Sequence, residues 1–267
     1  MASVPADDLV LSAKSGRVRT ARKLARRASR AEEGLFLAEG PQAVREALTV
    51  PGCVREVFAV PGRHEDLQVE AGVPWRLADE DALVALSDTV HPQGVVAVCA
   101  SLDVPLAGLL DASPRLVAVC ADVRDPGNAG AVVRCSDAAG AGGVVLTGDS
   151  VDVYNGKTVR ASAGSLFHLP VVVEKDAAAT VAALRGSGLT VLAADGAGEI
   201  DLDDAADTGL LAGRTAWLFG NEAWGLPDDL AALADHRVRV PIHGRAESLN
   251  LATAAAVCLY ASARGQR

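Results

Sequence analysis

The sequence lacks the patterns that mark several common protein classes. No two cysteines are spaced as CxxC, and the odd number of widely separated cysteines excludes a disulfide framework and a zinc ribbon; they are Cys53, Cys99, Cys120, Cys135 and Cys258. No charged-then-apolar segment opens the chain, and the most apolar run, Leu249 to Ala263, is shorter than the roughly 18–20 residues that cross a bilayer. We therefore expect a soluble, cytoplasmic protein with no membrane partner and no metal.

Nucleotide-binding fingerprints are missing as well. The chain contains no GKS or GKT and so has no P-loop. Gly127 and Gly130 are not spaced as a GxGxxG that directly follows a strand, and no acidic residue is well placed at the end of the next strand. A nicotinamide oxidoreductase is therefore only a distant alternative.

What the chain does contain is a long alternation of strand and helix patterns. Its 267 residues, half of them hydrophobic, can bury a substantial core, and we favour two domains. In the first part we expect strands in GLFLAEG, VREVFAV and GVVAVCA and helices over Pro41–Leu48 and Asp79–Leu86. In the second part we expect apolar strands at Leu116–Ala121, Gly143–Leu146, Val171–Val173, Thr190–Ala194, Thr215–Phe219 and Arg237–Val240.

This alternation predicts an α/β fold with a mostly parallel sheet covered on both faces. We place an N-terminal domain at 1–104, a linker at 105–114 between Pro105 and Pro114, and a second domain at 115–267. The acidic stretch Glu199–Asp207 is interpreted as a surface loop.

Positive charge is concentrated near the N-terminus of an acidic chain. The formal net charge is −9, yet eight basic residues and no acidic one lie between positions 14 and 30: Lys14, Arg17, Arg19, Arg22, Lys23, Arg26, Arg27 and Arg30. From Arg19 onward their spacing predicts one face of a single helix, which suits contact with the phosphates of RNA or DNA better than an ordinary solvated surface.

Chemistry is expected where parallel strands end, because their carboxyl ends share one edge of a sheet. Asn128 and Ser248 can each be explained as a helix N-cap, Arg134 as a surface ion pair, and isolated glycines as positive-φ positions. Three ordered motifs are nevertheless improbable by chance: N-x-G-x-x-x-R from Asn128, G-N-E-x-x-G-L from Gly220, and P-I-x-G-x-x-x-S-L-N from Pro241.

This ordered set resembles the SpoU/TrmH branch of the SPOUT methyltransferases, which transfer a methyl group from S-adenosylmethionine to a ribose 2′-hydroxyl in ribosomal or transfer RNA. The resemblance is strong over about Arg115–Arg267, and GLFLAEGPQAVREAL resembles the small substrate-binding domain that many members carry. It implies a C-terminal SPOUT-type α/β domain with a deep trefoil knot, preceded by a small α/β ribosomal-protein-like RNA-binding domain. The two-domain form is similar to ribosomal-RNA ribose methyltransferases, including the thiostrepton-resistance type.

The resemblance also implies roles for individual residues. S-adenosylmethionine would be bound by Ala194, Leu218, Gly220, Asn221, Val240, Ile242 and Leu249. The catalytic set would be Arg134, Asn128, Glu222, Ser248 and Asn250. We expect Arg134 to grip phosphate and stabilise developing alkoxide charge, and Glu222 to orient it or to accept the proton. RNA would contact Arg19, Arg22, Lys23, Arg26, Arg27, Arg30 and Arg160. A homodimer is expected to form through Leu251–Ala263.

The favoured function is S-adenosylmethionine-dependent ribose 2′-O-methylation of 23S ribosomal RNA. The alternatives are a transfer-RNA ribose methyltransferase, a non-catalytic RNA-binding ribosome-assembly protein of the same fold, and a base methyltransferase acting on guanine. The last would need an aspartate positioned as the ring-nitrogen base.

Overall fold

The computed structural model describes residues 10–69, 72–89 and 91–267, which form two compact units. The first unit takes the described residues up to Leu102 together with the segment Tyr154–Phe167. The second unit consists of Asp103–Val153 and His168–Arg267. One segment from within the expected second domain thus packs with the N-terminal unit, and the expected linker at 105–114 contains a helix of the second unit.

The first unit is built around a four-stranded sheet in the order β1-β4-β2-β3. Strand β4 is antiparallel to β1 and β2, and β2 is parallel to β3. Its α-helices and strands are α1 (Gly16–Arg22), α2 (Arg27–Glu33), β1 (Leu35–Glu39), α3 (Pro41–Thr49), β2 (Val54–Ala59), β3 (Trp75–Leu77), α4 (Glu80–Leu86), β4 (Val95–Ala100) and α7 (Gly156–Ala161). Short 3-10 turns are η1 (Lys23–Ala25), η2 (Glu65–Val69) and η3 (Ser165–Phe167). Outside the basic segment, the strands and helices expected in this part of the sequence are confirmed.

The basic segment is not one helix, so that expectation was wrong. Helix α1 passes into η1, and Arg26 then has an extended backbone (φ −94°, ψ 133°) before α2 begins. Arg30 is only 6% exposed, and its Nη1 donates hydrogen bonds to the carbonyl oxygens of Leu24 (2.8 Å) and Ala25 (2.9 Å). Because those carbonyls belong to the turn between the helices, Arg30 stabilises the break instead of facing solvent with its neighbours.

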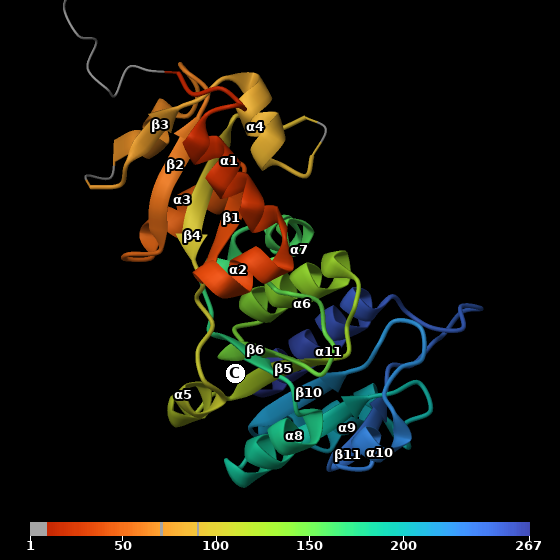
Figure 1. Ribbon diagram of the computed structural model, residues 1–267. Helices are drawn as coiled ribbons and strands as arrows, with labels where there is room; N and C mark the ends of the chain where they lie inside the picture. Colours follow the sequence, from red (N-terminus) through yellow and green to blue (C-terminus); the bar gives the residue numbers. More distant parts are fainter. Residues whose placement is uncertain (1–9, 70–71, 90) are drawn as a thin grey trace, which may run out of the picture. The chain divides into compact units, whose positions relative to one another are not determined.

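The second unit contains a seven-stranded sheet in the order β7-β6-β5-β10-β8-β11-β9, and every adjacent pair in it is parallel (Figure 1). Its α-helices and strands are α5 (Leu106–Asp111), β5 (Leu116–Ala121), α6 (Pro126–Ala138), β6 (Gly143–Thr147), β7 (Val171–Glu174), α8 (Ala177–Gly186), β8 (Thr190–Ala194), β9 (Ile200–Asp201), α9 (Leu202–Asp207), β10 (Thr215–Phe219), α10 (Asp228–Ala231), β11 (His236–Arg239) and α11 (Leu251–Gly265). A 3-10 turn, η4, covers Leu210–Ala212. The expected parallel α/β sheet is confirmed.

Alternate residues of the central strands face opposite sides of the sheet, and both sides are buried. Ala216 and Leu218 on β10 pack into a core with α5 and α8. On the other side, Trp217 donates a hydrogen bond from Nε1 to Ser262 Oγ of α11 (2.8 Å). Figure 1 shows α8 on one side of this sheet and α6 with α11 on the other.

The interpretation of Glu199–Asp207 as a loop was wrong. This stretch contains the edge strand β9 and helix α9. Asp201 caps the helix by accepting a hydrogen bond from Asp203 N (3.1 Å), while Leu202 and Ala205 are buried. The acidic side chains lie in the first turn, where they favour the helix, and on its outer face. Leu202 and Ala205 are three positions apart and share the inner face, so these two residues pack the helix against the core.

Candidate active site at the carboxyl ends of the parallel strands

A cavity of about 470 Å³ opens at the carboxyl ends of the strands in the second unit. Its walls come from Ala194–Gly196 after β8, Phe219–Glu222 after β10, and Glu247–Leu251 before α11. Val240 and Ile242, which follow β11, complete the apolar part of the wall. The volume falls within the range of about 300–1,000 Å³ that is typical of small-molecule sites. The location agrees with the rule that places ligands at this edge of a parallel sheet.

Most residues that the sequence assigned to cofactor binding lie on this wall. They are Ala194, Gly220, Asn221, Val240, Ile242 and Leu249. Leu218 does not line the cavity: its side chain is completely buried in the core shared with α5 and α8. Because side chains alternate along a strand, Leu218 faces that core and Phe219, its neighbour, lines the cavity.

Two acidic residues on the wall, Asp195 and Glu247, were missed in the sequence. Burial by itself would raise the pKa of Asp195, but hydrogen bonds from Ala197 N and the Arg237 guanidinium, with the charge of Arg237, lower the pKa below its ordinary value. Arg237 Nε lies 3.0 Å from Asp195 Oδ2. Asp195 is therefore a stable anion at neutral pH. The sequence could have pointed to Asp195 as a site residue, because it directly follows the predicted strand Thr190–Ala194.

The turn after β10 is held closed by its own backbone. Asn221 and Gly225 exchange two main-chain hydrogen bonds of 2.9 Å each. Gly225 has a φ of 71°, whereas Gly220 is needed for close packing, because a Cβ at Gly220 would lie 2.3 Å from the carbonyl carbon of Gly225. Asn221 Nδ2 also donates to the carbonyl oxygen of Asp122 (2.7 Å), which ties this turn to the end of β5.

Glu222, Asn128 and Asn250 form a polar cluster beside the cavity. Glu222 accepts hydrogen bonds from Arg124 N (3.2 Å), Asp125 N (3.1 Å) and Asn128 Nδ2 (3.2 Å). Asn128 Oδ1 in turn accepts from Asn250 Nδ2 at 3.1 Å. The structure thus brings together residues from all three sequence motifs, and the Glu222 carboxylate is positioned by a network of donors.

The helix caps differ from those considered in the sequence. Asp125, not Asn128, caps α6 by accepting a hydrogen bond from Asn128 N (2.9 Å). Asn250, not Ser248, caps α11 by accepting from Ala252 N at 2.9 Å. The Asn128 side chain is therefore free to join the cluster, while Asn250 uses its oxygen for the helix and its nitrogen for Asn128.

Arg134 and Ser248 lie outside this hydrogen-bonded cluster. Arg134 is exposed on α6 and has no hydrogen bond or ion pair with any described residue. Ser248 is exposed on the cavity wall and has no hydrogen-bond partner in the described part of the chain. Both side chains keep their full donor capacity for a ligand.

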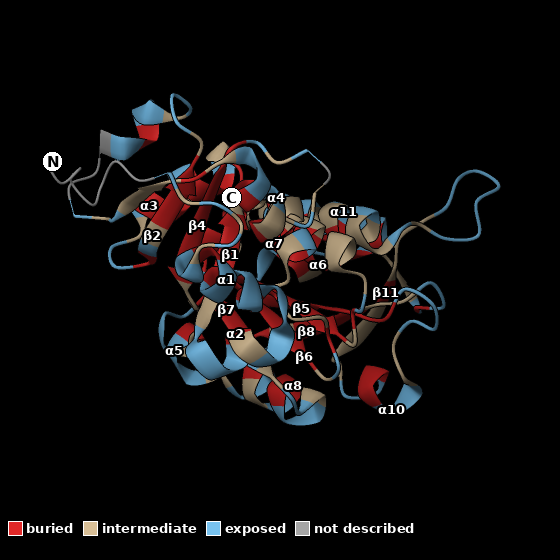
Figure 2. Cartoon of the chain, turned by 45° about the horizontal axis from the view of Figure 1, so that its top comes forward, coloured by how far each residue is buried: buried red, intermediate tan, exposed pale blue. Residues whose placement is uncertain are grey.

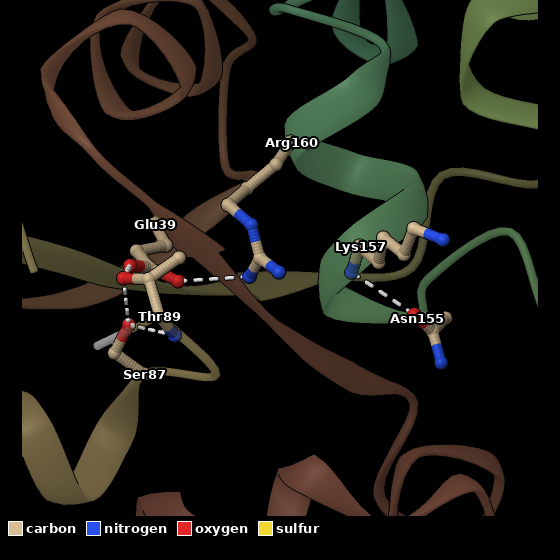
Figure 3. Close-up of polar contacts among 6 residues, drawn as sticks. All are labelled: Glu39, Ser87, Thr89, Asn155, Lys157 and Arg160. Carbon is tan, nitrogen blue, oxygen red and sulfur yellow. Dashed lines mark hydrogen bonds and ion pairs between the residues drawn. The ribbon is translucent and has the colours of Figure 1, made fainter. Parts of the chain in front are cut away.

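Arg160 has a partner within the first unit. Its Nη1 lies 2.9 Å from Glu39 Oε2, and Thr89 Oγ1 donates a hydrogen bond to the other carboxylate oxygen of Glu39 (Figure 3). Ser87 Oγ lies 2.9 Å from Thr89 Oγ1 and extends this network. The Arg160 guanidinium has further N–H groups, so a phosphate contact by Arg160 stays a prediction.

The other predicted RNA ligands of the first unit fall into two groups. Arg19, Arg22, Lys23, Arg26 and Arg27 are exposed, whereas Arg30 is buried.

No helix within the described residues is long and apolar enough to cross a membrane. Residues 10–69, 72–89 and 91–267 contain no group of three or more His, Cys, Asp or Glu side chains arranged to hold a metal.

The cavity suits a small molecule that is partly apolar and partly cationic. Val240, Ile242 and Leu249 provide an apolar wall, while Asp195, Glu222 and Glu247 provide carboxylates. S-adenosylmethionine combines an adenine with a sulfonium cation, so the apolar wall and the carboxylates fit it.

The thiol of Cys120 is not a nucleophile at neutral pH. Burial, with a smaller effect from the Glu222 charge, raises the pKa of Cys120 to about 12.

Comparison with known proteins agrees with this geometry. The sequence model described as the SpoU rRNA Methylase family matches residues 115–260, more than half of the chain. This chain belongs to the SpoU rRNA methylase family. The model of an MRM3-like substrate binding domain matches residues 16–97.

Relatives of this SpoU family member match nearly its whole length. The Bacillus subtilis protein named 23S rRNA (guanosine(2553)-2'-O)-methyltransferase RlmP is 35% identical, over 93% of this chain and 96% of the relative. An AdoMet-bound rRNA methyltransferase from Sinorhizobium meliloti is similar in structure, with a TM-score of 0.83, 31% identity and coverage of 96% and 98% of the two chains. The SpoU methyltransferase AviRb from Streptomyces viridochromogenes, in complex with AdoMet, has a TM-score of 0.80, 29% identity and coverage of 94% and 98%.

Proposed function

We propose that this protein transfers a methyl group from S-adenosylmethionine to a ribose 2′-hydroxyl of RNA, with 23S ribosomal RNA as its substrate. The observation that carries the proposal is the cavity at the strand ends, bordered by the Asn128–Glu222–Asn250 cluster. The names of RlmP and AviRb and the bound AdoMet in two structural relatives support the same reaction.

The cofactor is held by the cavity wall. Val240, Ile242 and Leu249 enclose the adenine, and main-chain groups near Gly220 and Ala194 approach it closely because neither residue carries a large side chain. When bound, S-adenosylmethionine supplies an electrophilic methyl group. The anionic side chains on the wall complement its positive charge.

The catalytic residues position the ribose and stabilise the charge that develops on its oxygen. Arg134 grips the phosphate next to the target ribose and stabilises the developing alkoxide with its planar fork of donors. Glu222 orients Asn128 and the start of α6 through the three hydrogen bonds that it accepts, and its exposed carboxylate accepts the proton that leaves the 2′-hydroxyl. Ser248 and Asn250 line the cavity and align the 2′-oxygen for in-line transfer.

The finer architecture is part of this proposal. The chain after β10 forms a deep trefoil knot around the cofactor, which is supported by the insertion of β10 between the earlier strands β5 and β8. Two copies associate through α11, on which Val257 and Tyr260 are exposed. Figure 2 shows α11 as a helix whose surface is largely exposed or of intermediate burial. The exposed arginines and lysine of α1, η1 and α2 bind RNA phosphates, and the protein acts in the cytoplasm.

The test is to incubate the purified protein with S-adenosylmethionine and protein-free 23S or transfer RNA lacking the modification, digest each RNA, and identify methylated nucleosides by mass spectrometry. A 2′-O-methyl nucleoside from 23S RNA is expected. A methylated base would contradict ribose chemistry, methylated transfer RNA alone would contradict the substrate, and cofactor binding without transfer to either RNA would favour a ribosome-assembly protein.

A further inference from the structure

An exposed tryptophan projects from the turn that borders the cavity. Aromatic residues make up only 3% of this chain, and one of them, Trp224, is 55% exposed. By contrast, Trp217 is completely buried in the core. Trp224 lies between Glu222 and Gly225, and both of these residues line the cavity. A large aromatic side chain left in solvent beside a candidate active site suggests a ligand that covers it.

The backbone that carries Trp224 is fixed. The reciprocal hydrogen bonds between Asn221 and Gly225 close the turn, and Asn221 Oδ1 accepts a further bond from Ala223 N at 2.8 Å. The link from Asn221 Nδ2 to Asp122 O attaches the turn to the sheet. The indole is thus presented by a preorganised support, which lowers the entropy cost of binding a ligand on it.

Arg124 occupies the space over the ring. Its Cζ lies 5.2 Å from the centroid of the Trp224 ring, which is cation–π geometry. The main-chain nitrogen of Arg124 donates to Glu222 Oε2 at 3.2 Å, so the same residue contacts the tryptophan and the polar cluster. The indole N–H of Trp224 has no hydrogen-bond partner among the described residues and can donate to a ligand.

The charges around this pair favour a base over a phosphate. Asp149 Oδ2 lies 3.8 Å from Arg124 Nη2, and Glu222 accepts the hydrogen bond from the Arg124 backbone. Asp122 Oδ1 accepts from Asp149 N at 2.7 Å and adds a third carboxylate. A phosphate would meet these carboxylates, whereas a neutral nucleobase can stack on the indole or on the plane of the guanidinium.

We propose that Trp224 and Arg124 form a stacking subsite for one unpaired RNA nucleobase, at or next to the nucleotide whose ribose is methylated. The subsite deepens the proposed function and rests on it, because it requires RNA at this cavity. It acts on substrate binding, and the residues assigned to cofactor binding and charge stabilisation are unchanged.

The test compares Trp224→Ala and Trp224→Phe in the full-length protein, with a mixed-sequence single-stranded RNA decamer as the probe. Trp224→Ala should weaken binding on the order of 10-fold at every salt concentration, because stacking releases no counterions. Trp224→Phe should bind within about threefold of wild type, since its ring still stacks. RNA should quench tryptophan fluorescence in the wild type and much less in Trp224→Phe. Arg124→Ala keeps the backbone bond to Glu222 and should weaken binding to a smaller extent.

Val173→Ala serves as the control, because Val173 is similarly exposed (51%) but lies on strand β7 at the edge of the sheet. It should bind the decamer like the wild type. The proposal is overturned if Trp224→Ala binds RNA normally, if its salt dependence becomes shallower, or if it alters only cofactor affinity or oligomeric state. Failure of the wild type to methylate ribose would defeat the proposed function instead, while the binding measurements would still report on the subsite.

Discussion

Arg134 combines a solvent-exposed guanidinium with a rigid attachment to the core. Val132 and Val133, its neighbours on α6, are buried, and the helix begins at a Pro126 turn capped by Asp125. The Arg134 side chain makes no polar contact with any described residue, so the fold does not use it. An arginine held in this way is available to a ligand at little cost to stability.

We expect Arg134→Ala to leave folding and S-adenosylmethionine binding nearly intact and to lower single-turnover methylation by roughly 10²–10³, the effect of deleting one preorganised donor. Arg134→Lys should also be impaired, because an ammonium group lacks the planar fork. Rapid-quench measurement at saturating RNA gives the rate. Arg55→Ala, which removes an exposed arginine from β2, is the control. Normal activity of Arg134→Ala would show that Arg134 is not catalytic. Normal activity of Arg134→Lys would show that a positive charge suffices and that the planar guanidinium is not needed.

Helix α11 is joined to the central strand β10 by a buried polar contact as well as by apolar packing. Ser262 Oγ accepts the hydrogen bond from Trp217 Nε1 at 2.8 Å and lies 3.3 Å from Thr215 Oγ1. All three residues are completely buried. The indole N–H therefore needs Ser262 Oγ as its hydrogen-bond acceptor, because a water molecule could take the place of this oxygen only if the surrounding side chains repacked.

We expect Ser262→Ala to lower the free energy of unfolding of the second unit by about 1–3 kcal/mol, the cost of an unsatisfied buried donor. Urea denaturation followed by circular dichroism measures it. Ser136→Ala is the matched control: Ser136 is equally buried on α6, but its hydroxyl donates to Val132 O within its own helix (2.8 Å). Removing that hydroxyl leaves no donor unpaired. Equal effects of the two substitutions would contradict this explanation.

The basic segment contains arginines with two different roles. Replacing Arg22, Arg26 and Arg27 together by alanine should weaken RNA binding and reduce its salt dependence, because fewer counterions are released. Cofactor affinity should not change. Arg30→Met should instead destabilise the first unit, because Arg30 bonds two carbonyl groups of the turn between α1 and α2. Filter binding over a range of salt concentrations and thermal unfolding separate the two effects.

A matched control for the triple variant exists within the same unit. Arg45, Arg55 and Arg63 are exposed and lie outside the basic segment, and Arg45 and Arg63 are each already paired with a carboxylate at 3.2 Å. Replacing these three by alanine removes the same positive charge and should change the salt dependence much less. If both triple variants lost the same slope, RNA binding would depend on the overall charge of the unit and not on the basic segment.

The assembly of two chains depends on the outer face of α11. Val257 (39% exposed) and Tyr260 (51%) lie on that face, while Cys258 and Leu259 are buried against the chain's own core. The double substitution Val257→Glu and Tyr260→Glu should convert a homodimer to a monomer, since it places charges in an apolar contact. Light scattering at micromolar concentration measures the mass. A wild-type monomer, or an unchanged mass in the double variant, would contradict the proposal.

Sequence patterns predicted the elements whose structure depends on neighbouring residues. The strands Leu116–Ala121, Thr190–Ala194 and Thr215–Phe219 have the expected bounds, because continuous apolar runs must be buried on both faces. The order of the polar motifs also predicted that Asn128, Glu222 and Asn250 would come together, since parallel strands bring their carboxyl ends to one edge. These features require only local periodicity and the direction of the chain.

Other features depend on contacts between distant residues, which no local pattern contains. Asn250 meets Asn128 across 122 positions. Leu218 faces the core although its strand was correctly located. Arg30 has the same residue type as Arg26 and Arg27 and lies in the same basic segment, yet it is buried. In each case the environment of the side chain depends on which part of the folded chain packs against it. A strand or helix has several faces, and the spacing of residues in the sequence does not say which segment will cover each face. Tertiary contacts therefore decide these features.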